Sequence, residues 1–309
     1  MNAKNAVEVN NLTKRYEGFL LDHISFQIPW GSVVGFIGEN GAGKSVTIKA
    51  MLGLLSVEEG EAYIAGNNVM NKNGSDIWKE QIGVVFDECN FPAGLKAKSI
   101  NNAMKYIYKT WKEDRFYSYV DQFKIPLNKK IKDLSKGMKM KLSIAVALSH
   151  DSRILILDEG TSGLDPVVRS EILDIFREFV EEEERAVFIS SHITSDIEKI
   201  ADYIMLIHEG SLLLYENKDE LIYRYGIVRC SKGQAEKIPK EMIVGKWENA
   251  YETSVLVRDR TAFERDGLVA LMESHKDPHP VLDKIQIEDI LIYMAKNGIK
   301  DQRKEGYVS

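Results

Sequence analysis

Residues Gly38–Ser45 read GENGAGKS, and they follow the apolar run SVVGFI at Ser32–Ile37. The octapeptide fits the pattern G-x-x-x-x-G-K-[ST], and the residues from Lys44 to Leu55 have the periodicity of a helix. The order of buried strand, glycine loop and helix matters, because the backbone N–H groups of the loop and the positive end of the helix dipole then point at one anion. The segment therefore predicts a phosphate-binding loop. The plainer interpretation is a glycine-rich turn that ends in Lys-Ser by chance.

The loop residues have distinct expected roles. Gly41 and Gly43 let the backbone approach phosphate oxygens without an intervening Cβ. Lys44 is expected to reach the β and γ phosphates of a nucleotide, and the hydroxyl of Ser45 is expected to ligate Mg²⁺. The nucleotide-binding candidates in this segment are Gly38, Asn40, Gly41, Ala42, Gly43, Lys44, Ser45 and Val46.

Two acidic residues, Asp158 and Glu159, follow the apolar run Arg153–Leu157. Ligands of open α/β sheets bind at the carboxyl ends of the strands, which is where these side chains lie if the run is a buried strand. Asp158 is then placed to hold Mg²⁺ through water, and Glu159 to activate an attacking water as general base. An ordinary acidic loop after a strand is the alternative, and the phosphate loop upstream favours the nucleotide site.

The rest of the chain alternates apolar strands with helical patterns. A helix is expected at Pro166–Glu184, with Asp165 as its N-cap and Pro166 in the first helical position. Further strands are expected at Val7–Leu12, His23–Ile28, Glu61–Ala65, Ile82–Phe86, Ala186–Ser190 and Tyr203–Ile207. Such alternation predicts an α/β fold with helices packed on a parallel sheet.

Two other segments differ from this alternation. From Phe91 to His150 the periodicity is helical and rich in lysine. Around Gly226 the pattern weakens, and the residues from there to Ser309 are expected to form a small α+β unit with a closing helix at Glu288–Ala295.

Composition excludes several classes of protein. The chain has 309 residues, 44% of them hydrophobic, and 41 Lys+Arg against 47 Asp+Glu give a net charge of −6, which argues against disorder and against a dedicated nucleic-acid binder. The longest run without a charged residue, His23–Gly38, is too short to span a bilayer. The N-terminus lacks an apolar signal core, so we expect no secretion. Cys89 and Cys230 fit no metal or disulfide pattern and are expected to be free thiols in a reducing cytoplasm.

With these motifs in order, the chain resembles the ATP-binding subunit of an ABC transporter. Leu134–Met138 (LSKGM) stands where that family has its LSGGQ signature, and Ser162–Asp165 (SGLD) resembles the D-loop. His192 resembles the switch histidine, and Tyr16 matches the aromatic residue that stacks on adenine. The resemblance extends over about Val7 to Leu221.

The resemblance implies a P-loop NTPase cassette with an antiparallel β subdomain and a helical subdomain. The implied domains are the cassette at 1–225, with the helical subdomain at about 88–150, and a C-terminal α+β accessory domain at 226–309. It implies ATP and Mg²⁺ as cofactors. It also implies two partners, an integral-membrane permease that this chain lacks and a second cassette, identical or different. The expected location is cytoplasmic, on the inner face of the cell membrane, with no nucleic-acid partner.

The implied mechanism places each ATP between the phosphate loop of one cassette and the signature of the other. Ser135 and the Gly137 backbone would contact the γ-phosphate across the interface, and Asp165 would link the two sites. His192 would bind the γ-phosphate and help to position the water, so the catalytic candidates are Glu159 and His192. ATP binding closes the dimer and hydrolysis reopens it. The segment near Phe91–Leu95 is expected to face the permease.

Two motifs depart from the family pattern at three positions. Asp87 stands where the family has the Q-loop glutamine, and we expect this carboxylate to bind Mg²⁺ directly or through a water; a solvated loop acid is the alternative. In the signature, Lys136 and Met138 replace Gly and Gln. Lys136 either adds positive charge near the nucleotide or points to solvent, and the sequence slightly favours solvent.

The C-terminal segment Ile287–Leu291 (IEDIL) resembles the closing helix of ABC-2-type exporters, which favours an exporter over an importer. Two other functions stay open. One is an ABC ATPase that acts on ribosomes or nucleic acid, and the other is a weakly hydrolysing regulatory module. The single phosphate loop, the single signature and the absence of heptads argue against the first; Glu159 and His192 argue against the second.

Overall fold

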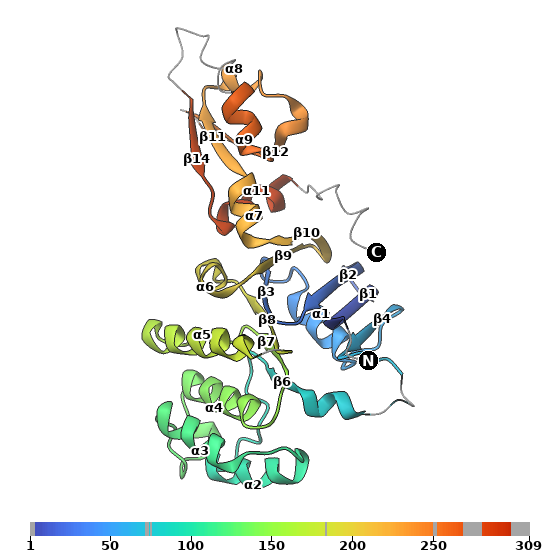
Figure 1. Cartoon of the computed structure of the whole chain (residues 1–309), viewed down its shortest axis with the longest axis vertical. Coiled ribbons are helices and arrows are strands. Elements are labelled where there is room, and N and C mark those ends of the chain that lie inside the picture. The colour runs from blue at the N-terminus through green and yellow to red at the C-terminus, as the bar shows by residue number, and fades with distance from the viewer. Residues whose placement is uncertain are drawn as a thin grey trace.

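The computed structural model describes residues 4–71, 74, 76–182, 184–249, 252–267 and 280–297. Figure 1 shows an elongated molecule with a bundle of helices at one end, a mixed α/β body in the middle and a smaller α+β unit at the other end. The last residues of the expected 226–309 unit, 298–309, lie outside the described residues.

A six-stranded sheet forms the centre of the body, in the order β10-β9-β3-β8-β7-β6. Its five strands from β9 to β6 run parallel, and β10 pairs antiparallel with β9 at the edge. The residues of β3, β7 and β8 are all buried, because helices and a second sheet cover both faces. The strands are β3 (Ser32–Ile37), β6 (Ile82–Val85), β7 (Ile154–Asp158), β8 (Ala186–Ser191), β9 (Tyr203–His208) and β10 (Ser211–Asn217). The prediction of a parallel sheet is confirmed; β10 was not expected.

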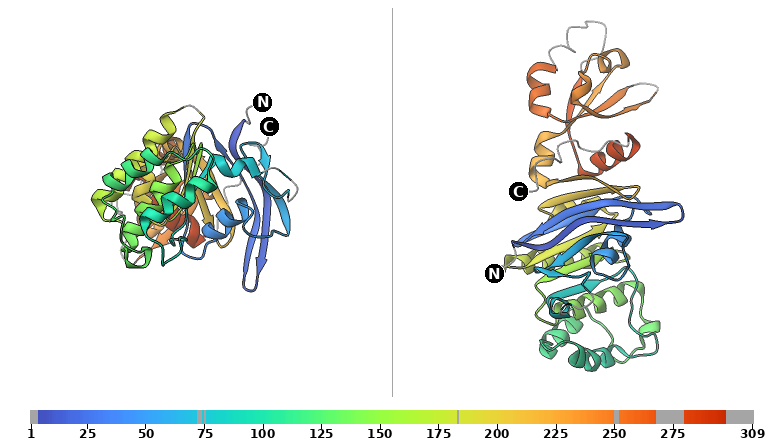
Figure 2. Two further views of the ribbon diagram at one scale, coloured as in Figure 1. Left: turned by 90° about the horizontal axis from the view of Figure 1, so that it is seen from below. Right: turned by 90° about the vertical axis from the view of Figure 1, so that its right-hand side faces the viewer.

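A second, antiparallel sheet has the order β2-β1-β4-β5. It shares one core with helix α1 and the central sheet, in which the ring of Phe188 stacks on Phe26 and Phe36. The right-hand view of Figure 2 shows the long β1 and β2 strands projecting from the body. The strands are β1 (Asn5–Tyr16), β2 (Phe19–Pro29), β4 (Glu59–Ile64) and β5 (Asn67–Asn68).

The helices of the body pack on the central sheet. Helix α1 (Lys44–Met51) ends before the expected Leu55, because the chain leaves the helix at Gly53, which has φ +67°. Asp165 caps α5 (Pro166–Glu181) as expected, since its Oδ1 accepts a hydrogen bond from the Val168 N–H at 3.1 Å. This helix stops short of Glu184 because the chain is extended at residue 182. The other helices here are α6 (Thr194–Ile200), α7 (Lys218–Arg224) and the 3-10 helix η1 (Asp76–Gln81).

The helical end consists of α2 (Ala97–Ile107), α3 (Glu113–Gln122) and α4 (Lys136–Leu148), with the short η2 (Ile131–Asp133) before α4. These elements share a core with one face of the central sheet. A buried amide organises the bundle, since Asn101 donates to Glu113 at 2.6 Å and accepts from the Trp111 indole at 2.9 Å.

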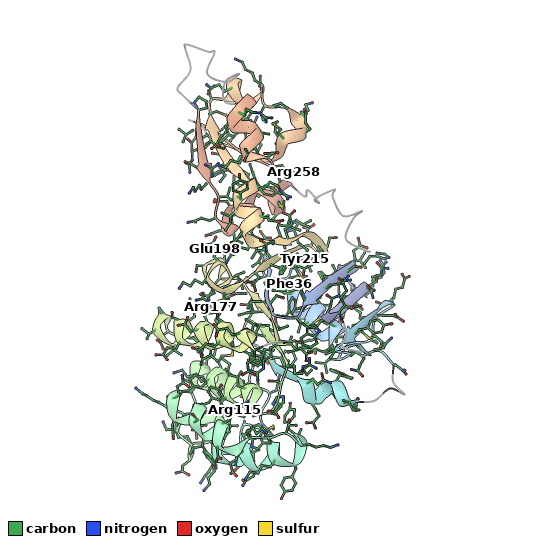
Figure 3. All side chains as sticks on the ribbon, in the orientation of Figure 1. Phe36, Arg115, Arg177, Glu198, Tyr215 and Arg258 are labelled. Atoms are coloured by element: carbon green, nitrogen blue, oxygen red, sulfur yellow. The ribbon has the colours of Figure 1, made fainter. Side chains whose placement is uncertain are left out.

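The C-terminal unit is built on a third sheet, with the order β12-β13-β11-β14. Its closing helix α11 (Ile287–Asn297) confirms the helix expected at Glu288–Ala295 and packs against α6. At this junction Glu198, labelled in Figure 3, accepts a hydrogen bond from the Ile287 N–H at 2.6 Å. The other elements are β11 (Gly226–Cys230), α8 (Lys232–Ala235), η3 (Lys240–Met242), β12 (Ile243–Glu248), β13 (Thr253–Val257), α9 (Arg260–Ala262), η4 (Phe263–Gly267) and β14 (Val281–Lys284).

Among the described residues, no helix combines the length and the apolar character that crossing a membrane requires.

Candidate functional site

The loop from Gly38 to Gly43 connects the carboxyl end of β3 to the first turn of α1. Gly43 has φ +114°, and a Cβ there would lie 2.9 Å from the ring of Phe19, so both backbone conformation and space require glycine. Lys44 is buried, and its ammonium donates to the carbonyl oxygens of Gly38 at 2.7 Å and Glu39 at 3.3 Å. The loop thus holds its lysine against its own backbone, at the centre of the predicted phosphate site.

The two acids at the end of β7 are arranged by the neighbouring strand. The buried carboxylate of Asp158 accepts from the Ser190 hydroxyl, with 2.8 Å between the oxygens. The Ser190 hydroxyl in turn accepts from the Glu159 N–H at 3.0 Å. Glu159 has φ +57°, a left-handed conformation that is uncommon for a non-glycine residue. One serine therefore fixes both acids, and sequence reasoning missed it; the signal was the parallel register that pairs Asp158 with Ser190.

The Glu159 carboxylate contacts side chains from two other elements. Its Oε2 lies 2.5 Å from Nδ1 of His192, which follows β8. Its Oε1 lies 3.5 Å from Nζ of Lys44. The structure thus brings together the proposed general base, the proposed switch histidine and the phosphate-loop lysine.

These groups face a cavity of about 430 Å³. Its lining residues come from the phosphate loop, the hairpin between β1 and β2, and the loops after β6, β7 and β8: Phe19, Glu39, Asn40, Gly41, Gly43, Lys44, Ser45, Val46, Asp87, Glu159, Ser162 and His192. The loop residues Gly41 and Gly43 and the acid Glu159 line the same cavity. The geometry is that of a nucleotide site at the carboxyl edge of a parallel sheet.

Comparison with known proteins identifies the family. The family model for the ABC transporter matches residues 21–162. Bacitracin transport ATP-binding protein BcrA of Bacillus licheniformis is 37% identical over 211 residues, which cover 67% of this chain and 68% of that protein. The chain belongs to the ABC transporter family of ATP-binding proteins.

Other relatives and solved structures agree. Lantibiotic transport ATP-binding protein SrtF of Streptococcus pyogenes is 32% identical over 224 residues, which cover 69% of this chain and 91% of that protein. A solved ATP-binding subunit of an ABC transporter has a TM-score of 0.64 and 25% identity, and the match covers 70% of this chain and 91% of that one. The P-loop NTPase fold and the ABC cassette are therefore confirmed, and the protein is an ABC ATPase that binds and hydrolyses ATP.

The aromatic residue beside the site differs in part from expectation. Tyr16 does not line the cavity; its side chain is half-exposed, and the Lys14 ammonium lies 5.3 Å from the centre of its ring. Phe19, the direct cross-strand partner of Tyr16, does line it. Sequence reasoning missed Phe19, and the assignment of Tyr16 to adenine stays a prediction.

Three of the ABC signature and D-loop residues, Ser135, Gly137 and Asp165, lie at helix N-termini outside this cavity, whereas Ser162 of the D-loop lines it. Ser135 is the N-cap of α4, with its Oγ accepting from the Met138 N–H at 3.2 Å, and Asp165 is the N-cap of α5. Gly137 packs closely, since a Cβ there would lie 3.2 Å from the Gly163 carbonyl oxygen. Ser135, Gly137 and Asp165 do not line the nucleotide cavity of the chain to which they belong.

Two of the three residues that depart from the ABC pattern contact each other. Nζ of Lys136 lies 2.8 Å from Oδ1 of Asp87 and 3.2 Å from Oγ of Ser162. Asp87 lines the nucleotide cavity, and its binding to Mg²⁺ stays a prediction. Lys136 is exposed, as the sequence slightly favoured, but its ammonium is paired with Asp87 beside the site, so both interpretations hold in part.

The oxygen donors present fit Mg²⁺. Ser45 and Asp87 line the cavity; Asp158 precedes the lining residue Glu159, and one of its oxygens is held by Ser190. Within the described part of the chain, no three His, Cys, Asp or Glu side chains form a metal-holding group. Such a site suits Mg²⁺. Proteins usually bind this ion through one or two carboxylates, and substrate phosphates and waters supply its remaining ligands.

Proposed function

We propose that this chain is the ATPase subunit of a bacterial ABC exporter, located in the cytoplasm on the inner face of the membrane. One observation supports this most strongly: Lys44, Glu159 and His192 converge on a single cavity beside the phosphate loop. The relatives that transport bacitracin and lantibiotics support export of peptide-like molecules. We divide the chain into a cassette at 1–225, with a helical subdomain at about 88–150, and an accessory domain at 226–309.

In the proposed reaction, Lys44 and the loop backbone bind the β and γ phosphates. Ser45 and Asp158 would hold Mg²⁺, and Asp87 lines the same cavity as Ser45. Bound Mg²⁺ supplies positive charge that offsets the charge of the phosphates. Glu159 accepts a proton from the attacking water, and the short contact with His192 keeps this carboxylate directed into the cavity.

The site needs a second cassette. Ser135, Gly137 and Asp165 lie outside their own cavity, so we assign them to the nucleotide of a facing cassette. The Ser135 hydroxyl accepts a backbone hydrogen bond and still has its own proton to donate to a phosphate oxygen. The N-terminus of the 13-residue helix α4 adds its positive dipole end there. Loss of the γ-phosphate removes these contacts and lets the cassettes separate.

We place the permease contact at a second cavity, of about 530 Å³, next to the first. It lies between the segment that follows β6 and the start of α4, and its apolar residues include Phe86, Phe91 and Met140. Asp87 lines both cavities. A segment of the permease seated in the second cavity would therefore lie next to a residue that also lines the nucleotide cavity.

Two measurements test the proposal. The purified chain should bind ATP and, with Mg²⁺, release phosphate, and Lys44→Ala should abolish both; ATP binding without turnover, even when the permease is present, would instead indicate a regulatory module. Purification from detergent-solubilised membranes should recover an integral membrane protein together with this chain. Recovery with ribosomes in its place would contradict the exporter assignment.

A further inference from the structure

The ion pair between Asp87 and Lys136 connects two parts of the molecule. Asp87 follows β6 of the central sheet, and Lys136 is the first residue of α4 in the helical end. The ammonium also contacts Oγ of Ser162, which lies in the D-loop and lines the nucleotide cavity. One lysine therefore touches two cavity-lining residues from two different loops.

The ion pair matters because more acidic than basic side chains line the nucleotide cavity. Three carboxylates line the cavity, those of Glu39, Asp87 and Glu159, and Lys44 is the one lysine or arginine among the lining residues. Lys44 is the near neighbour of Glu159, at 3.5 Å. ATP is highly anionic, and an uncompensated carboxylate at Asp87 would repel it. Lys136 compensates that charge from outside the lining.

We propose that Lys136 is a positioning residue for Asp87, which holds this carboxylate at the helical side of the cavity and cancels its charge so that the triphosphate can enter. The lysine in the signature and the acid in the Q-loop thus act as one unit, a charged pair at positions where the family has neutral residues. Lys136 acts through Asp87, and not by contact with the phosphates. The inference rests on the proposed nucleotide site.

The geometry predicts the size of the effect. Both side chains are about half-exposed, so solvent and salt partly screen the interaction. Removing the one compensating charge of Lys136 from this half-exposed pair should weaken ATP affinity about tenfold. The effect should shrink as ionic strength rises, because screening weakens the repulsion between Asp87 and ATP.

The test measures ATP affinity by calorimetry in EDTA, so that Mg²⁺ and turnover play no part. Lys136→Met should weaken ATP binding about tenfold at low salt and less at high salt. Lys136→Met combined with Asp87→Asn should return to within about twofold of the wild type, because the carboxylate that needs compensation is gone. Lys136→Arg should bind as the wild type does, since arginine can make the same pair.

Lys141→Met is the matched control, since this lysine is on the same helix and lines neither cavity. Equal binding by Lys136→Met and the wild type would overturn the proposal. So would a double variant as weak as Lys136→Met, which would show that Lys136 contacts the phosphates itself. If Lys136→Met does not fold, Asp87→Asn alone decides, because it should bind ATP at least as tightly as the wild type. Failure of the wild type itself to bind ATP would instead refute the nucleotide site.

Discussion

Oε2 of Glu159 lies 2.5 Å from Nδ1 of His192, although the two residues belong to loops that follow different strands. The Glu159 backbone has φ +57°, and such a conformation costs on the order of 1–3 kcal/mol. The surrounding contacts offset this cost: Ser190 binds the Glu159 N–H, and Lys44 and His192 lie on either side of the carboxylate. A strained backbone at this position directs the carboxylate into the cavity.

The first prediction concerns catalysis. Glu159→Gln keeps the shape of the side chain but removes the base, so ATP hydrolysis should fall by about 10²–10⁴-fold while ATP affinity stays within a few-fold. Phosphate release and nucleotide binding, measured on the same protein, check this. Glu178→Gln, an exposed change on α5, is the control. Turnover close to that of the wild type would refute the role of Glu159.

The second prediction concerns Ser190, which the sequence did not identify. Ser190→Ala removes the donor to Asp158 and one of the two acceptors for the Glu159 N–H. The buried Asp158 carboxylate then loses its donor, whereas the Glu159 N–H keeps the Ser190 carbonyl oxygen at 3.2 Å. The free energy of unfolding should therefore fall by about 1–3 kcal/mol, and more Mg²⁺ should be needed for half-maximal hydrolysis.

The control for Ser190→Ala is Ser152→Ala. The Ser152 hydroxyl is also buried and donates to the Ala147 carbonyl oxygen at 3.0 Å, away from the nucleotide cavity. This variant should lose stability without a change in the Mg²⁺ requirement. If the two variants have the same Mg²⁺ dependence, Ser190 does not position Asp158.

The third prediction concerns pH. His150 is buried, its ring stacks on Tyr108 with centroids 4.0 Å apart, and its Nε2 donates to the Ile82 carbonyl oxygen at 2.9 Å. Burial lowers the pKa of His150 in the folded state. The unfolded chain therefore binds a proton at this residue more readily, and stability is lost as pH falls through the ordinary histidine range near 6.5.

Urea unfolding of His150→Phe between pH 5 and pH 8 tests this. Phenylalanine keeps the ring against Tyr108 but loses the bond to Ile82, so it should cost about 1 kcal/mol at pH 8. Its stability should then decline less steeply toward pH 5 than that of the wild type. Parallel profiles for His150→Phe and the wild type would contradict the prediction.

The fourth prediction concerns the attachment of the C-terminal unit. The Glu198 carboxylate on α6 accepts from the first N–H of α11, and Ile287 and Ile290 share a core with Ile197. Glu198→Ala leaves that N–H without its acceptor and should cost about 0.5–2 kcal/mol, as loss of a helix cap does. Hydrogen exchange of α11 should become faster, while Lys199→Ala on the same helix should have no effect. Unchanged exchange in Glu198→Ala would show that the apolar contacts alone hold α11.

Much of the fold followed from local sequence pattern. The strand Ser32–Ile37, the start of α1 at Lys44 and the cap of α5 at Asp165 are set by residues close to one another in the chain, which is why they were predictable. The end of α1 and the extra strand β10 were not. A helix end depends on a single left-handed residue, and an edge strand depends on pairing with a neighbour.

The sequence by itself determined the kind of site, because the phosphate loop, the acids after β7 and His192 stand in a fixed order along the chain. Only the tertiary structure decided which side chains act together. Ser190 reaches Asp158 because β7 and β8 pair in parallel with their ends in register. Lys136 reaches Asp87 because α4 packs against β6, so an exposed lysine that the sequence left between solvent and the nucleotide pairs with an acid of the cavity. Such pairings depend on strand order and helix packing, which join residues that are distant in the chain.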